Sequence, residues 1–132
     1  MKINIVVDKA LNAGQKANVS AIIMGQFGRD IPTLYANAVE DISGIRHAGI
    51  SVNVVILDGS NGQLLTLIEA TRKADVSCIV FSATGQFLSN SYPEYQQQIS
   101  LSETKATNII GVGIVGEDDA VRSLTKKFSL VK

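Results

Sequence analysis

The chain has 132 residues, in which 12 lysines and arginines balance 12 aspartates and glutamates, with one histidine and one cysteine. Hydrophobic residues make up 45%, charged residues 18% and prolines only 2, which excludes a disordered chain and favours a single globular domain over residues 1–132. Zero net charge argues against a nucleic-acid-binding protein, and one cysteine excludes a disulfide framework or a multi-thiolate metal site.

The first residues and the longest uncharged stretch indicate the compartment. Met1 and Lys2 lead directly into a short apolar run, without the basic region, long apolar segment and cleavage site of a secretory signal. Residues 76–93 carry no charge, but their many serine, glutamine and asparagine side chains make them too polar to span a bilayer. We therefore expect a cytoplasmic protein with no membrane segment.

The first half of the chain predicts two strands around a helix. The apolar run 3–7 ends at a polar Asp-Lys pair, as a buried strand does. Residues 15–27 carry apolar side chains at helical spacing, and Pro32 follows the end of that helix. Ser43-Gly44 predicts a turn between two short extended pieces, and the β-branched run 50–57 predicts the second strand.

The second half continues the alternation of strands and helices. It predicts a helix over 62–74, a strand over 76–83, a polar segment over 84–105, a strand over 109–115 and a helix over 117–128. The fold class expected is therefore α/β, a three-layer α/β/α sandwich around a mostly parallel, mixed sheet of about four main strands. The final strand of the sheet could pair in either direction.

The glycine pattern over 111–116 has the spacing of a dinucleotide-binding loop between a strand and a helix. Three consecutive carboxylates at 117–119 would open that helix and repel a pyrophosphate. We therefore interpret the glycines as allowing the helix and neighbouring strands to pack closely, and we expect no cofactor.

The other residues with reactive side chains have structural interpretations. His47 is the only histidine, so no second imidazole is available for a multi-histidine metal site, and we expect it to hydrogen-bond locally in a turn, with a functional role as the alternative. Cys78 lies in an apolar run, where a thiol behaves as a small hydrophobic side chain. Arg122, Lys126 and Lys127 complement the dipole of the last helix, and a phosphate-binding patch is the alternative. We expect no metal site.

Polar side chains near the ends of the first and third strands form the candidate site. Open α/β sheets bind ligands outside the carboxyl ends of their strands, where such side chains could share one crevice. The ligand-binding candidates are Asp8, Gln15, Asn18, Ser82, Thr84 and Gln86. Hydroxyl and amide groups suit a small, neutral ligand. In the alternative interpretation, Asp8 and Thr84 only cap the segments that follow them.

Several segments in order also resemble a known family. They are Ile-Val-Val-Asp-Lys-Ala-Leu-Asn-Ala-Gly-Gln-Lys-Ala-Asn at 5–18, His-Ala-Gly-Ile at 47–50, Tyr-Pro-Glu-Tyr at 92–95, and the glycine-rich 110–116 followed by Leu124-Thr125. Over essentially the whole chain, this order resembles the bacterial domain-of-unknown-function family two thousand, whose fold is similar to peptidyl-tRNA hydrolase type two. The resemblance implies that fold, with a crevice at the ends of the strands.

The resemblance also bears on catalysis. The hydrolases use a lysine at the start of the first helix and an aspartate and a threonine after the third strand. Gln15 and Ser82 stand at the positions of the lysine and the aspartate, while Thr84 matches the threonine. Lys16 points about 100° away from Gln15 on a helix, so it is a poor substitute. The replacements weaken the case for an ester hydrolase.

Three functions are consistent with these features. The leading one is an uncharacterised cytoplasmic domain that binds a small polar ligand or a protein partner at the strand ends, and the replacements at Gln15 and Ser82 weigh against an enzyme without deciding the question. The alternative is a hydrolase of a tRNA or nucleotide ester, but only Lys9 and Lys16 are cations near the candidate site, which makes nucleic acid an unfavourable partner. The third is an interaction protein, and a homodimer is expected because so few charged residues leave apolar surface to cover.

Overall fold

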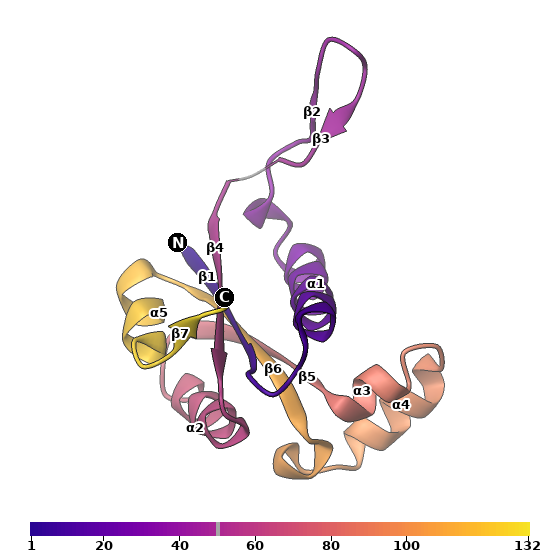
Figure 1. Ribbon diagram of the computed structural model, residues 1–132, viewed down its shortest axis with the longest axis vertical. Coiled ribbons are helices and arrows are strands. Elements are labelled where there is room, and N and C mark those ends of the chain that lie inside the picture. Colours follow the sequence, from indigo (N-terminus) through magenta and orange to yellow (C-terminus); the bar gives the residue numbers. More distant parts are fainter. Residues whose placement is uncertain (50) are drawn as a thin grey trace.

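The computed structural model describes residues 1–49 and 51–132, and its centre is a five-stranded sheet (Figure 1). The strands lie in the order β5-β6-β1-β4-β7. Their bounds are Lys2–Asp8 for β1, Asn53–Gly59 for β4, Val76–Ser82 for β5, Ile109–Gly116 for β6 and Ser129–Leu130 for β7. The β1–β4 pair is parallel, whereas the β1–β6, β5–β6 and β4–β7 pairs are antiparallel. The mixed α/β class is confirmed, but the expectation of a mostly parallel sheet was wrong.

The connection from β5 to β6 explains the antiparallel pairing. This connection contains α3 (Ala83–Phe87), α4 (Tyr92–Ser100) and the 3₁₀ helix η2 (Thr104–Thr107). Its two ends meet, since the Ala83 amide donates to the Asn108 carbonyl at 2.8 Å. β6 therefore begins beside the point where β5 ends, and the two neighbouring strands run in opposite directions. As a result β6 separates β1 from β5, although these two strands run in the same direction.

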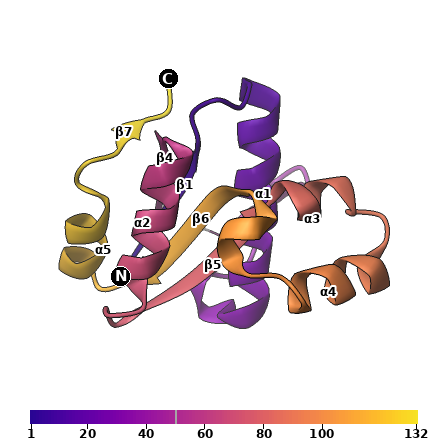
Figure 2. The same ribbon diagram turned by 90° about the horizontal axis from the view of Figure 1, so that it is seen from below.

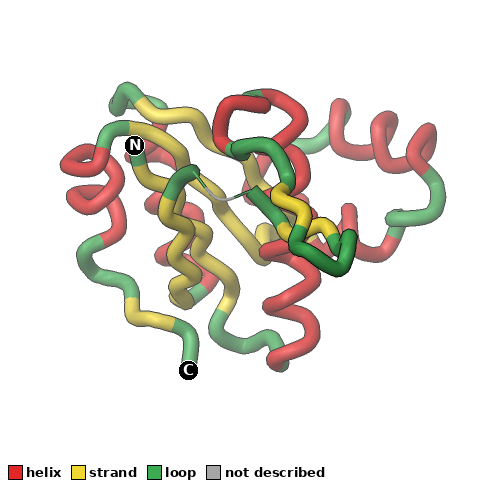
Figure 3. The backbone as a smooth tube through the Cα atoms, turned by 90° about the horizontal axis from the view of Figure 1, so that it is seen from above, coloured by secondary structure: helices red, strands yellow, loops and turns green. Residues whose placement is uncertain are grey.

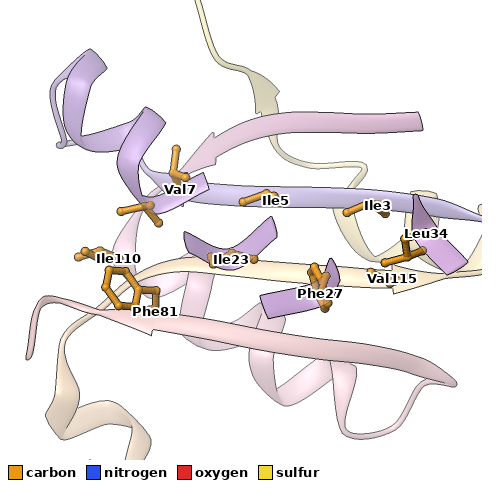
Figure 4. Close-up of a cluster of buried hydrophobic side chains, with 10 residues drawn as sticks. Ile3, Ile5, Val7, Ile23, Phe27, Leu34, Phe81, Ile110 and Val115 are labelled. Carbon is orange, nitrogen blue, oxygen red and sulfur yellow. The ribbon is translucent and has the colours of Figure 1, made fainter. Parts of the chain in front are cut away.

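Helices pack against both faces of the sheet (Figure 2). Helix α1 (Ala13–Asp30) packs on one face, while α2 (Asn61–Thr71) and α5 (Asp118–Thr125) pack on the other. Alternate residues of β1 supply both cores, because successive strand side chains point to opposite faces. Ile3 and Ile5 join Phe27 of α1 (Figure 4), and Val6 belongs to the cluster on the α2 side.

The glycines of β6 allow α1 to lie close to the sheet. A Cβ atom added at Gly111 would lie 2.4 Å from Val19 Cγ1, and one added at Gly113 would lie 2.4 Å from Ile23 Cγ2 and 2.6 Å from Phe27 Cε2. No real Cβ atom tolerates such distances, so the helix would have to move outward. The interpretation of Gly111 and Gly113 as packing residues is confirmed, but the helix that packs on them is α1 and not the helix that follows β6.

A two-stranded hairpin projects from the body of the molecule (Figure 1), and Figure 3 shows it from above, in front of the body. It pairs β2 (Val39–Glu40) with β3 (Arg46–His47), and we call residues 39–47 the arm. The predicted turn at Ser43-Gly44 is confirmed, with Gly44 in the left-handed region at φ 82°. A 3₁₀ helix, η1 (Pro32–Leu34), leads into the arm.

Several element boundaries differ from the expectations. The second predicted strand began at residue 50, which lies outside the described residues, and the observed β4 begins at Asn53. The polar segment 84–105 contains the two helices α3 and α4, and the last helix ends at Thr125 rather than 128. The short strand β7 had no counterpart in the sequence-based expectations, because two residues give no recognisable periodicity.

Candidate functional site

Ser82 lies where β5 passes into α3, and its side chain begins that helix. Its residue surface is only 3% exposed. The hydroxyl oxygen accepts a hydrogen bond from the Gly85 amide at 3.0 Å, which satisfies a free amide of the first helical turn. The hydroxyl can still donate its own hydrogen, so Ser82 can both cap the helix and bind a ligand.

A cavity of about 230 Å³ lies next to Ser82, where α4 and η2 cover the beginning of β6 and the end of β5. We call it the hydroxyl cavity, because five hydroxyl side chains line it together with three apolar residues. The lining consists of Ser82, Tyr95, Ser102, Thr104 and Thr107 with Val80, Ile99 and Ile109. Among the described residues that line it, none carries a charge.

Hydrogen bonds within the β5–β6 connection hold the walls of the hydroxyl cavity. Thr107 donates its hydroxyl to the Thr104 carbonyl at 2.7 Å, and Ser102 donates to the Gln98 carbonyl at 2.7 Å. Thr84 donates to the Thr107 carbonyl at 3.3 Å and so links α3 to η2. An ion inside these uncharged walls would lose hydration without gaining an opposite charge, so the cavity favours a neutral ligand that forms hydrogen bonds.

The first three candidate residues lie outside the hydroxyl cavity. Asp8 is half-buried at the end of β1, where its carboxylate accepts from the Ala10 amide at 2.9 Å. Gln15 is exposed and forms a capping box with Asn12, since each side chain accepts from the backbone amide of the other. Asn18 is exposed on α1. The local contacts of Asp8 and Gln15 stabilise a turn and a helix end.

The remaining two candidates lie on α3. Thr84 is half-buried and supports the cavity from outside through its bond to Thr107, and Gln86 is half-buried on the same helix. Neither lines the hydroxyl cavity. Of the six candidates the cavity therefore includes Ser82 alone. Sequence reasoning missed the other four hydroxyl residues, although all of them lie in or beside the polar segment 84–105: Tyr95, Ser102, Thr104 and Thr107.

An ion pair that sequence reasoning also missed joins α1 to β4. Lys16 Nζ lies 3.3 Å from Asp58 Oδ2, and the two side chains are only 16% and 23% exposed. The Lys16 side chain thus neutralises a carboxylate at the end of β4 instead of lying free beside Gln15. Asp58 could have been included among the candidate site residues, since it directly follows the predicted second strand as Asp8 directly follows the first.

The two residues with potentially reactive side chains, His47 and Cys78, have structural roles in the fold. His47 Nε2 lies 2.7 Å from Asp41 Oδ2 within the arm, which confirms the expected local hydrogen bond, although His47 lies in β3 and not in a turn. Burial raises the pKa of the Cys78 thiol, against a smaller opposing effect of a hydrogen bond with Thr71, so the thiol stays protonated. Within the described ranges, no three metal-binding side chains are grouped, and no helix is long and apolar enough to cross a membrane.

A second cavity, of about 790 Å³, is a groove between α2 and α5 and shares no lining residue with the hydroxyl cavity. Its floor is apolar, with Leu67 and Ala70 from α2 and Leu124 and Phe128 from α5 and the turn after it. The two adjacent lysines at 126 and 127 also line it, without any acidic side chain in the lining. We call this feature the α2–α5 groove.

The fold and the site define a mixed α/β protein with helices on both sheet faces and a small uncharged cavity beside the end of β5. A family model described as "Protein of unknown function (DUF2000)" matches residues 1–132, so the chain belongs to this family. The similarity of the fold to peptidyl-tRNA hydrolase type two stays a prediction.

Comparison with solved structures finds a protein of unknown function from Agrobacterium tumefaciens strain C58. Its TM-score is 0.86 at 17% sequence identity, and the alignment covers 99% of this chain and 97% of that one. At this identity the likeness shows a common fold. No curated protein matches the sequence.

Proposed function

We propose that this protein binds a small, neutral, polar ligand in the hydroxyl cavity and catalyses no reaction on it. The observation that carries the proposal is the set of five hydroxyl groups around about 230 Å³ of space without a charged side chain. That volume equals roughly seven or eight waters at their liquid density, so the ligand is a small amide, polyol or similar molecule. Ser82 would donate its free hydroxyl hydrogen to it.

Fragment binding tests the proposal. A panel of neutral amides and polyols, with carboxylates and phosphates as the charged comparison, is titrated into the protein and followed by backbone amide NMR. We expect the neutral fragments alone to shift the resonances of residues 82, 95 and 104. Shifts confined to other surfaces, or a preference for anions, would overturn the proposal.

Variants separate ligand contacts from folding. Ser82→Ala also removes the cap of α3, so Thr104→Val is the cleaner change, because it replaces only the hydroxyl by a methyl group. Loss of one hydrogen bond should weaken fragment binding about 2- to 10-fold. The matched control is Thr33→Val, at an exposed threonine in η1 that lies outside the cavity. Equal weakening by both variants would contradict the assignment of Thr104.

Hydrolysis of peptidyl-tRNA is not part of the proposal. In this chain the Gln15 side chain is occupied in a capping box, and the Lys16 ammonium is paired with Asp58. We expect the purified protein to release no more peptide from peptidyl-tRNA than a buffer blank. Turnover that disappears in Thr84→Ala would instead establish the hydrolase alternative.

We also propose that two copies of the chain associate. The support is apolar surface on the arm, where Val39 is 64% exposed, Ile45 is 61% exposed and Ile42 is fully exposed. Soluble monomers rarely leave such side chains grouped in water. Light scattering should give twice the 14.1 kDa chain mass, falling towards it over about a hundredfold dilution. A constant monomer mass from the highest concentration downwards would refute association.

A further inference from the structure

The arm is an ordered projection. Asp41 Oδ1 accepts from the amides of Ser43 and Ile45 at 2.9 and 3.1 Å, while its Oδ2 pairs with His47. The backbone adds bonds from Asp41 to Ile45 and from Gly44 to Asp41. The hairpin therefore holds its exposed apolar side chains in place before a partner binds. This preorganisation reduces the conformational entropy lost on binding.

The charges of the arm and of the α2–α5 groove are opposite. The arm contains two acidic side chains, Glu40 and Asp41, and one basic side chain, Arg46, which is the cross-strand partner of Glu40. With His47 neutral, the arm therefore carries one net negative charge. The groove is lined by two lysines and no acid, over an apolar floor. The arm combines apolar and acidic side chains where the groove combines apolar and basic ones, so the two surfaces are complementary.

The arm of a chain does not contact its own groove. Figure 1 shows the arm extending from the end of the molecule opposite to α2, with the body of the sheet between them. An arm that docks in the groove must therefore belong to another molecule. Each chain carries both surfaces, so a twofold axis would form the contact twice in one dimer.

We propose that two copies of this chain exchange arms, with Ile42 of each arm inserted among Leu67, Leu124 and Phe128 of the other copy's α2–α5 groove. The lysines at the groove then lie close to the acidic side chains of the arm. This contact rests on the homodimer proposed above and specifies its interface. Burial of an exposed isoleucine favours each contact, and a symmetric dimer has two such contacts.

Light scattering of two matched variants tests the role of the arm. Ile42→Asp places a charge at the tip of the arm, where the side chain has no packing to lose. We expect it to raise the dissociation constant of the dimer at least tenfold. Ile22→Asp is the control, at a 46% exposed position on α1, and should leave the dimer intact. A dimer unaffected by Ile42→Asp would overturn the arm exchange while the homodimer stands, whereas a monomeric wild type would overturn both.

Disulfide trapping tests where the arm docks. In a Cys78→Ser background, Ile42→Cys on one chain is mixed with Ser123→Cys, at the groove, on a second chain carrying a mass tag. Mild oxidation should link the two different chains faster than it links either chain to itself. Ser89→Cys, at an exposed position outside the groove, is the control partner and should not be trapped. Preferential linking of Ile42→Cys chains to each other would show arm-to-arm pairing and overturn the proposal.

Discussion

At the scale of single residues, Asn4 shows how one polar side chain joins a strand to a helix. It is 3% exposed in β1, and its Nδ2 donates to the Thr125 hydroxyl oxygen at 2.8 Å. Thr125 in turn donates to the Val121 carbonyl within α5 at 2.8 Å. The Asn4 Oδ1 atom is buried and has no partner among the described residues. The amide therefore fixes the position of α5 while it leaves one acceptor unsatisfied.

We expect Thr125→Val to cost more stability than Asn4→Leu. The first substitution leaves the buried Asn4 amide without its acceptor and should lower the free energy of unfolding by about 1–3 kcal/mol. The second removes both amide atoms, including the unsatisfied oxygen, while Thr125 keeps its bond to Val121. Its effect should be smaller, within about 1 kcal/mol of zero. Urea unfolding followed by circular dichroism measures both, and an equal cost would contradict this account.

At the scale of elements, the spacing between α1 and the sheet depends on side chains that β6 lacks. The helix lies over Gly111 and Gly113, so Val19, Ile23 and Phe27 contact the strand backbone directly. Two cores then share one sheet, since the other face of β6 supplies Val112 and Ile114 to the cluster under α2. A change in the spacing of one layer thus alters the packing of the largest buried side chain, Phe27.

Gly113→Ala should destabilise the protein by about 1–3 kcal/mol, because the new methyl group overlaps Ile23 and Phe27. The control is Gly25→Ala, in the helix α1 that packs on Gly113, where nothing lies within 4 Å of the added Cβ atom. That substitution should stabilise by about 0.5–1 kcal/mol through helix propensity. Thermal and urea unfolding of the pair would measure the difference, and the same sign for both would argue against close packing at Gly113.

The arm should lose order in acid. The hydrogen bond with His47, with smaller help from the Ile45 amide, lowers the pKa of Asp41 below its ordinary 3.8. A carboxylate with a lowered pKa stabilises the folded arm above 3.8 and ceases to do so as the pH falls through the lower folded value. The amides of residues 43 and 45 should stay protected from hydrogen exchange at pH 5. They should lose this protection as the pH falls below 3.8 and through the lower pKa of the folded arm. Asp41→Asn should show weak protection at both pH values.

At the scale of the whole molecule, the strand order decides which parts open last. β1 and β6 lie between other strands and pack on both faces, whereas β7 pairs through two residues at the sheet edge. Local stability follows burial and the number of hydrogen-bonded neighbours. The molecule therefore combines a rigid centre with an exposed edge and the projecting arm.

Native-state hydrogen exchange should rank the elements in that order. We expect the amides of residues 5 and 112 to exchange only on global unfolding, and those of β7 and the arm to exchange through small local openings at neutral pH. In the Ile42→Asp variant the arm should exchange faster, since it loses its docked partner. Slow exchange in β7 equal to that in β1 would contradict the strand order as the determinant of local stability.

The sequence by itself determined most of the elements and the family. Runs such as 3–7 and 109–115 are recognisable because burial on both faces requires consecutive apolar residues, and Ser43-Gly44 specifies its turn locally. His47 could be assigned a local role, and the packing role of Gly111 and Gly113 followed from the carboxylates after them. Each of these features depends on residues close together in the chain.

Only the tertiary structure decided which elements lie side by side. The return of the chain at Ala83 and Asn108 makes β6 antiparallel, because a hydrogen bond between residues far apart in sequence leaves no periodic pattern. The same holds for the Lys16–Asp58 pair and for the hydroxyl cavity, where Ser82 meets Tyr95 and Thr107. Pairing and cavities depend on the distance between side chains in space, which long-range packing sets and local sequence does not encode.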